Sequence, residues 1–151
     1  MRVSSSVHRR MKGVLGICAV LLVFNVSVAM ACLCDGESPK RTIKKLRKTA
    51  TVIFSGTVTE VTKEVKDGRI GYWATLKVKQ SWKSDRVEEL RMYYTVGGCS
   101  AWFEEGRTYM VYAKPDAEGR LSTSVCMRTR LIEGAAEDLK LLGKPQFTAA
   151  P

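Results

Sequence analysis

Alternation of apolar and polar residues predicts β-strands through the middle of the chain. Of five short segments, the first four have apolar side chains at every second position, which places them on one face of a sheet, and the fifth is a plausible further strand. These segments are residues 52–58, 72–78, 90–96, 109–113 and 121–125. Gly56 interrupts the first segment and predicts a bulge, and Asp67-Gly68 predicts a hairpin turn before the second. Five short strands joined by turns predict a small barrel or sandwich.

Two segments follow the helical period instead. Ser38-Pro39 has the form of an N-cap followed by proline at the first helical position, and it predicts a helix over roughly residues 39–48. Residues 135–142 predict a closing helix that ends at Gly143. Residues 146–151 are expected to form a loose tail. The sequence contains no internal repeat and no linker, so we predict one domain.

The polar face of the first predicted helix is strongly basic. It carries Lys40, Arg41, Lys44, Lys45, Arg47 and Lys48. Such a face is either solvated surface or a binding patch. No aromatic residue is interleaved for stacking on bases, so we expect no nucleic-acid site there. The prominent aromatic residues elsewhere are Tyr72, Trp73, Trp82, Tyr93 and Trp102. We expect them in the core or on the sheet surface rather than in an oligonucleotide or oligosaccharide site.

Residues 1–31 are typical of a secretory signal peptide. Basic residues precede an apolar run over 14–28 that is too short for a transmembrane helix. Small residues then precede a cleavage point after Ala31. The mature chain, residues 32–151, would begin at Cys32 and contain no transmembrane segment. We expect it to be secreted or periplasmic, and monomeric.

The predicted cleavage also limits the catalytic and metal sites that the mature chain can form. It removes four basic residues and no acidic ones, so the formal net charge falls from +10 to about +6, a mild excess that suits attraction to acidic surfaces. The only histidine, His8, and the only asparagine, Asn25, are removed as well. Without histidine the mature chain cannot build a Ser-His-Asp triad or a histidine-ligated metal site. We therefore expect no enzymatic activity and no cofactor, and we place Glu88-Glu89 and Glu104-Glu105 on solvated surface.

Four cysteines remain in the mature chain, and their number predicts disulfides in an exported protein. They are Cys32, Cys34, Cys99 and Cys126, since Cys18 leaves with the signal. A bond between Cys32 and Cys34 would close a small, strained ring, which leaves two cross-pairings open. The Cys-x-Cys pair also allows a soft-metal or redox site, or lipidation of Cys32. Two structural disulfides are the interpretation that we prefer.

Several motifs, taken in order, resemble the inhibitory N-terminal domain of tissue inhibitors of metalloproteinases, in the netrin-like superfamily. They are Cys32-Leu33-Cys34 after the cleavage point, ATVIFSGTV over 50–58, VKQSWK over 78–83, Cys99 with the segment 103–113, and Cys126 with the helix at 135–143. The resemblance implies an all-β fold, a five-stranded OB-like closed barrel with flanking short helices. It also implies two disulfides, Cys32–Cys99 and Cys34–Cys126.

The resemblance further implies a function for the N-terminal edge, Cys32, Leu33 and Cys34. In that family the α-amine and carbonyl of the first cysteine chelate the catalytic zinc of the target protease, and the second residue enters its specificity pocket. Mapped onto this chain, Cys32 binds the zinc of a metalloendopeptidase and Leu33 fills the pocket, while Gly97, Gly98 and Cys99 offer a secondary contact. The alternatives are a non-inhibitory netrin-like interaction module and an envelope protein that is lipid-anchored through Cys32.

Overall fold

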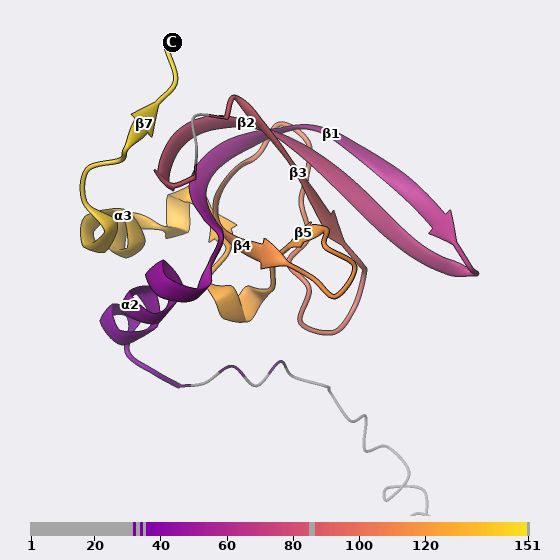
Figure 1. Cartoon of the computed structure of the whole chain (residues 1–151), viewed down its shortest axis with the longest axis horizontal. Helices are drawn as coiled ribbons and strands as arrows, with labels where there is room; N and C mark the ends of the chain where they lie inside the picture. Colours follow the sequence, from indigo (N-terminus) through magenta and orange to yellow (C-terminus); the bar gives the residue numbers. More distant parts are fainter. Residues whose placement is uncertain (1–31, 33, 35, 85–86, 151) are drawn as a thin grey trace, which may run out of the picture. The chain divides into compact units, whose positions relative to one another are not determined.

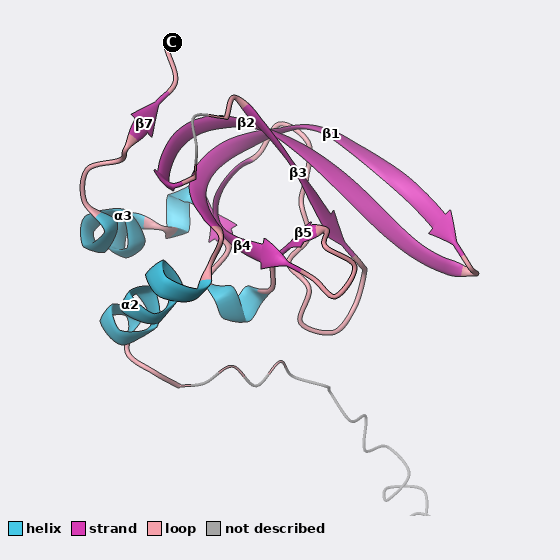
Figure 2. Cartoon of the chain, viewed as in Figure 1, coloured by secondary structure: helices cyan, strands magenta, loops and turns pink. Residues whose placement is uncertain are grey.

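The computed structural model describes residues 32, 34, 36–84 and 87–150. The predicted signal peptide and Leu33 therefore lie outside the described residues. The elements, in chain order, are α2 (Pro39–Thr49), β1 (Val52–Lys66), β2 (Arg69–Lys83), β3 (Glu89–Tyr94), β4 (Thr108–Pro115), β5 (Leu121–Ser122), η1 (Val125–Met127), β6 (Arg130–Leu131), η2 (Ile132–Gly134), α3 (Ala136–Leu142) and β7 (Phe147–Thr148). Figures 1 and 2 show a mostly β structure with short helices beside the sheet.

Five strands are joined in a ring. β1 pairs with both β2 and β4, and β3 pairs with the other edge of β2. The short strand β5 closes the ring, because it pairs antiparallel with β4 and parallel with β3, at Tyr93 and Ser122. The prediction of a mainly β fold with two helices is confirmed, and each helix is close to its predicted bounds.

The hairpin of β1 and β2 is longer than the sequence pattern predicted. Its turn is at Asp67-Gly68, as predicted, and both residues have positive φ, 51° and 72°. The register shifts between Ser55 and Gly56, which confirms the predicted bulge. In Figure 1 the far end of the hairpin extends away from the helices. There Val65 and Ile70 face solvent and the strands no longer cover a core, so the alternation of apolar residues stops before the strands do.

Two other predictions were wrong. Residues 121–125 were expected to form one strand, but only Leu121 and Ser122 do, and Val125 begins η1. The tail is not loose, because β7 continues along the edge of β2 through the pairs Ser81–Phe147 and Gln80–Thr148. Phe147 is half-buried against the core inside the ring. A lone aromatic residue in a polar tail gives no periodic signal, so the sequence pattern missed this strand.

The core lies on both faces of part of the ring. One cluster fills the inside of the ring and includes Phe54, Met92 and Val111. The other lies outside it, where Ile53 and Tyr112 pack against residues of α2 and α3. Successive residues along β1 and along β4 point to opposite faces of the sheet. Because these successive residues are apolar, both faces of the sheet are apolar there. Burial on both faces holds α2 and α3, together with the chain segments next to them, against the ring.

Candidate functional site

Two segments far apart in the sequence lie side by side and carry Cys99 and Cys126. The backbone N–H of Val125 donates to the carbonyl of Cys99 at 3.0 Å. Next to this bond, Ser100 and Ser124 form an isolated antiparallel bridge. Because these two contacts bring the cysteines together, cysteines only two residues apart at the N-terminal edge can each reach a different partner.

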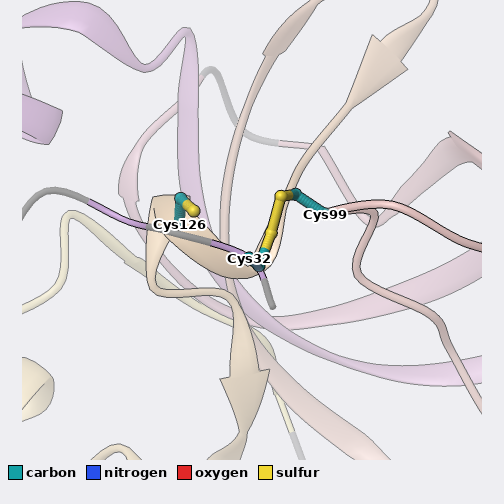
Figure 3. Close-up of side chains that lie close together, drawn as sticks. All are labelled: Cys32, Cys99 and Cys126. Carbon is teal, nitrogen blue, oxygen red and sulfur yellow. A yellow bond between two sulfur atoms is a disulfide. The ribbon is translucent and has the colours of Figure 1, made fainter. Parts of the chain in front are cut away.

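The structure contains the disulfides Cys32–Cys99 and Cys34–Cys126, with Cα–Cα distances of 5.5 and 5.1 Å. This is the pairing implied by the family resemblance. The sulfur atoms of Cys32, Cys99 and Cys126 all lie within 4.8 Å of one another, and Figure 3 shows Cys126 beside the Cys32–Cys99 bond. The sulfur of Cys126 therefore lies within reach of Cys32 as well as bonding to Cys34. While both bonds are intact, these cysteines offer no thiolate for a soft metal.

The loop between β3 and β4 carries Cys99 and is fixed from inside the ring. Phe103 is buried and packs edge-on against the rings of Tyr94 and Tyr109, with centroid distances of 5.6 and 5.0 Å. Tyr94 also donates its hydroxyl hydrogen to the carbonyl of Phe103 at 3.3 Å. Burial raises the pKa of both tyrosines, so both hydroxyls stay protonated, and the hydroxyl of Tyr109 accepts a hydrogen bond from the backbone N–H of Glu104 at 3.2 Å. Gly97 and Gly98 are exposed with φ of 103° and 60°, a region that other residues rarely adopt.

Exposed apolar side chains gather on the two segments that carry Cys99 and Cys126. Val96, Trp102 and Val125 are 68%, 65% and 46% exposed, and the only other large apolar residues as open in the described chain are Val65 and Ile70 of the hairpin. Trp102 stands between two buried residues and so points away from the core. Large apolar side chains exposed on neighbouring segments make this surface a candidate for a protein contact. Sequence analysis placed Trp102 in the core or on the sheet surface, and Val96 and Val125 at the ends of predicted strands. These placements were wrong, because all three residues are exposed and lie outside the strands.

A buried ion pair fixes η1, the segment that contains Cys126. Arg128, with φ of 63°, donates from Nε and Nη2 to the carboxylate of Asp138 at 2.8 and 2.7 Å. The hydroxyl of Tyr112 donates to the same carboxylate at 2.9 Å. These contacts join η1 to α3 and β4. No sequence motif marked them, because Asp138 resembles an ordinary charge in the first turn of a helix.

The same hydrogen bonds set the charge state of this ion pair. Burial disfavours the ionised form of Asp138, but hydrogen bonds from Arg128 and Tyr112 outweigh it and lower the pKa of Asp138. The hydrogen bond to Asp138 in turn raises the pKa of Arg128. Burial, with the nearby carboxylate, raises the pKa of Tyr112 far above its ordinary value. The network is therefore an ionised Arg–Asp pair with a protonated tyrosine.

The backbone at the N-terminal edge has one internal contact that bears on metal binding. The N–H of Cys34 donates to the carbonyl oxygen of Cys32 at 3.1 Å. A carbonyl oxygen has two lone pairs, so one stays available for another partner. The role predicted for Leu33 falls outside the described residues.

The acidic pairs are exposed, as the sequence predicted. Glu105 also has a structural contact, because its carboxylate accepts a hydrogen bond from the backbone N–H of Val61 at 2.7 Å. This bond ties the loop after Phe103 to β1.

No protein-family model matches this chain, and no curated protein sequence matches it. In the described part of the chain, no helix has both the length and the apolar character needed to cross a membrane.

Proposed function

We propose that this chain is an exported, non-enzymatic inhibitor of zinc metalloendopeptidases. In this proposal the ring of five strands is an OB-like closed barrel, and the edge Cys32, Leu33 and Cys34 enters the protease cleft. One observation carries the proposal: two disulfides fix alternate residues of a single short edge onto neighbouring segments that also expose Val96, Trp102 and Val125. A short segment held in this way resembles a preformed ligand rather than a free chain end.

The chemistry follows from what a catalytic zinc accepts. Such a zinc keeps one coordination position open for water or substrate. Cleavage after Ala31 would give Cys32 a free α-amine, whose pKa near 8 makes deprotonation by the metal inexpensive. The free lone pair on the Cys32 carbonyl supplies a second donor on the same residue. Because the disulfide to Cys99 orders Cys32 before binding, less conformational entropy is lost on association.

The surroundings of the edge suit a protein partner. Leu33 is an apolar side chain of a size that fits a protease specificity pocket. Val96, Trp102 and Val125 would contact the protease around the cleft, and a buried tryptophan such as Trp102 commonly contributes a large share of the binding energy. The small residues Gly97 and Gly98 would let the protease approach the Cys99 disulfide closely.

A second function, a netrin-like interaction module without inhibitory activity, rests on the same exposed apolar residues. Val96, Trp102 and Val125 can dock a partner whether or not Cys32 has a free amine. The two functions differ in what they require of the N-terminus. Inhibition needs the amine of Cys32, whereas docking through the apolar residues does not.

The deciding experiment changes only the amine. One alanine added before Cys32 converts the amine into an amide, a poor zinc ligand, and pushes bulk into the cleft while both disulfides can still form. Its matched control carries one alanine after Pro151. Both are titrated against a panel of secreted zinc endopeptidases. We expect the control to inhibit and the N-terminal extension to lose inhibition by orders of magnitude. Equal inhibition by both would move the contact away from Cys32, and inhibition by neither would favour the interaction module.

A further inference from the structure

The basic residues at the C-terminal end of α2 have a structural explanation. Arg47 donates to the carbonyl of Leu142 at the end of α3. Lys83 approaches from β2, and its Nζ donates to the carbonyls of Arg47 and Lys48 at 2.8 and 3.3 Å. The last carbonyls of a helix are unpaired and carry partial negative charge, so cations stabilise this end. The positive charge here serves the fold.

The basic residues at the other end of α2 have no such explanation. Lys40 and Arg41 lie in the first turn, which contains no acidic residue. Cations are unfavourable there, because the first turn carries partial positive charge. Lys40, Arg41 and Lys44 are exposed, and none of them forms an ion pair with a carboxylate among the residues that the structure describes. In the described part of the chain, no ion pair of these three residues supports the fold.

The shape of α2 restricts what these charges can bind. Ile43 and Leu46 are buried against the ring and α3, so the apolar stripe of the helix is already used. Lys40, Arg41 and Lys44 are exposed and lie outside this apolar stripe, on a helix about 16 Å long. None of them lines the cavity of about 260 Å³ beside the helix. Exposed cations outside a cavity suit an extended anionic surface better than a small enclosed ligand.

We propose that α2 docks this protein onto a bilayer that contains anionic phospholipid, with Lys40, Arg41 and Lys44 facing the headgroups. Binding is electrostatic and lies in the headgroup plane, because no apolar face of the helix is left to insert. Each basic residue close to an anionic membrane strengthens binding by about fivefold. Three together therefore contribute roughly a hundredfold, and added salt weakens the attraction. This surface does not depend on the inhibitor proposal, because neither Cys32 nor its amine takes part.

The test compares two triple variants of the exported protein, each of which loses three positive charges. One is Lys40→Gln with Arg41→Gln and Lys44→Gln. The control is Lys63→Gln with Lys66→Gln and Arg69→Gln, three exposed cations of the β1–β2 hairpin. Sedimentation measures binding to vesicles of phosphatidylglycerol and phosphatidylcholine, and to vesicles of phosphatidylcholine alone. We expect the parent protein and the hairpin variant to bind only the anionic vesicles, and the α2 variant to bind them roughly a hundredfold less tightly.

Several results would overturn the proposal. Equal losses in both variants would mean that net charge alone matters. Failure of the parent protein to bind anionic vesicles, with or without binding to a soluble sulfated polysaccharide, would rule out a membrane partner. The α2 variant should also unfold at the same temperature as the parent or a higher one, since unfavourable charges leave the first turn. A clear loss of thermal stability would show that these cations serve the fold and that the premise is wrong.

Discussion

The N-terminal edge with its supporting segments and the tip of the β1–β2 hairpin both expose apolar residues, but they are held in opposite ways. The hairpin tip is regular structure, paired residue by residue from Glu60 to the turn, yet no core lies beneath Val65 and Ile70. The edge is irregular chain, yet two disulfides, a buried ion pair and a buried phenylalanine fix the segments around it. Regular strand pairing and support by a buried core therefore do not coincide in these two regions.

The largest expected loss of stability comes from removing one disulfide at the N-terminal edge. Replacing Cys34 and Cys126 together with serine should lower the free energy of unfolding by about 4 kcal/mol, because the unfolded chain regains the freedom of a long loop. Urea unfolding measures the loss. Amide hydrogen exchange should quicken over residues 96–102 and stay unchanged over the hairpin tip. Faster exchange in both residues 96–102 and the hairpin tip would show that the same disulfide stabilises both regions.

A somewhat smaller effect should follow from breaking the ion pair behind Cys126. Asp138→Asn leaves the guanidinium of Arg128 without its buried partner and should lower the free energy of unfolding by about 3 kcal/mol. The matched control is Glu137→Gln, because Glu137 also approaches Arg128, at 3.5 Å, but is exposed. An exposed pair of this kind contributes less than about 1 kcal/mol. Equal losses in the two variants would contradict the importance of burial.

The contribution of the ion pair to stability should also depend on pH. The pKa of Asp138 is lower in the folded chain than in the unfolded chain, so its contribution is complete at pH values above the ordinary carboxyl pKa, near 3.9, and disappears as the pH falls through the folded pKa. The parent protein should therefore lose more stability than Asp138→Asn does as the pH is lowered below about 4. Parallel pH profiles for the two proteins would show that Asp138 is not the group responsible.

The smallest effects on stability should come from the exposed apolar residues of the two regions. Trp102→Ser and Val65→Ser replace side chains that are 65% and 64% exposed, so each should change the free energy of unfolding by less than about 1 kcal/mol. Their effects on binding should differ. In the inhibition assay Trp102→Ser should weaken the protein at least about tenfold through lost apolar contact, and Val65→Ser should not. A loss with Val65→Ser alone would move the contact to the hairpin.

Local sequence patterns determined those helices, strands and turns that depend on residues close together in the chain. Alternating apolar residues, the Asp67-Gly68 turn, the Ser38-Pro39 start and the Gly143 end all act within a few residues, and the structure has the corresponding elements. The number and spacing of the cysteines also limited the disulfide pairing to two choices, because neighbouring cysteines in a Cys-x-Cys segment are too close to bond without strain.

Only the tertiary structure decided what depends on residues distant in sequence. Cys99 and Cys126 meet because the bridge at Ser100 and Ser124 joins their segments, and β7 forms because β2 offers it an open edge. Trp102 and Ile53 are both apolar, yet one is exposed and the other is in the core. Periodicity describes the faces of one element, whereas burial depends on what packs against each face, and that partner is supplied by another part of the chain.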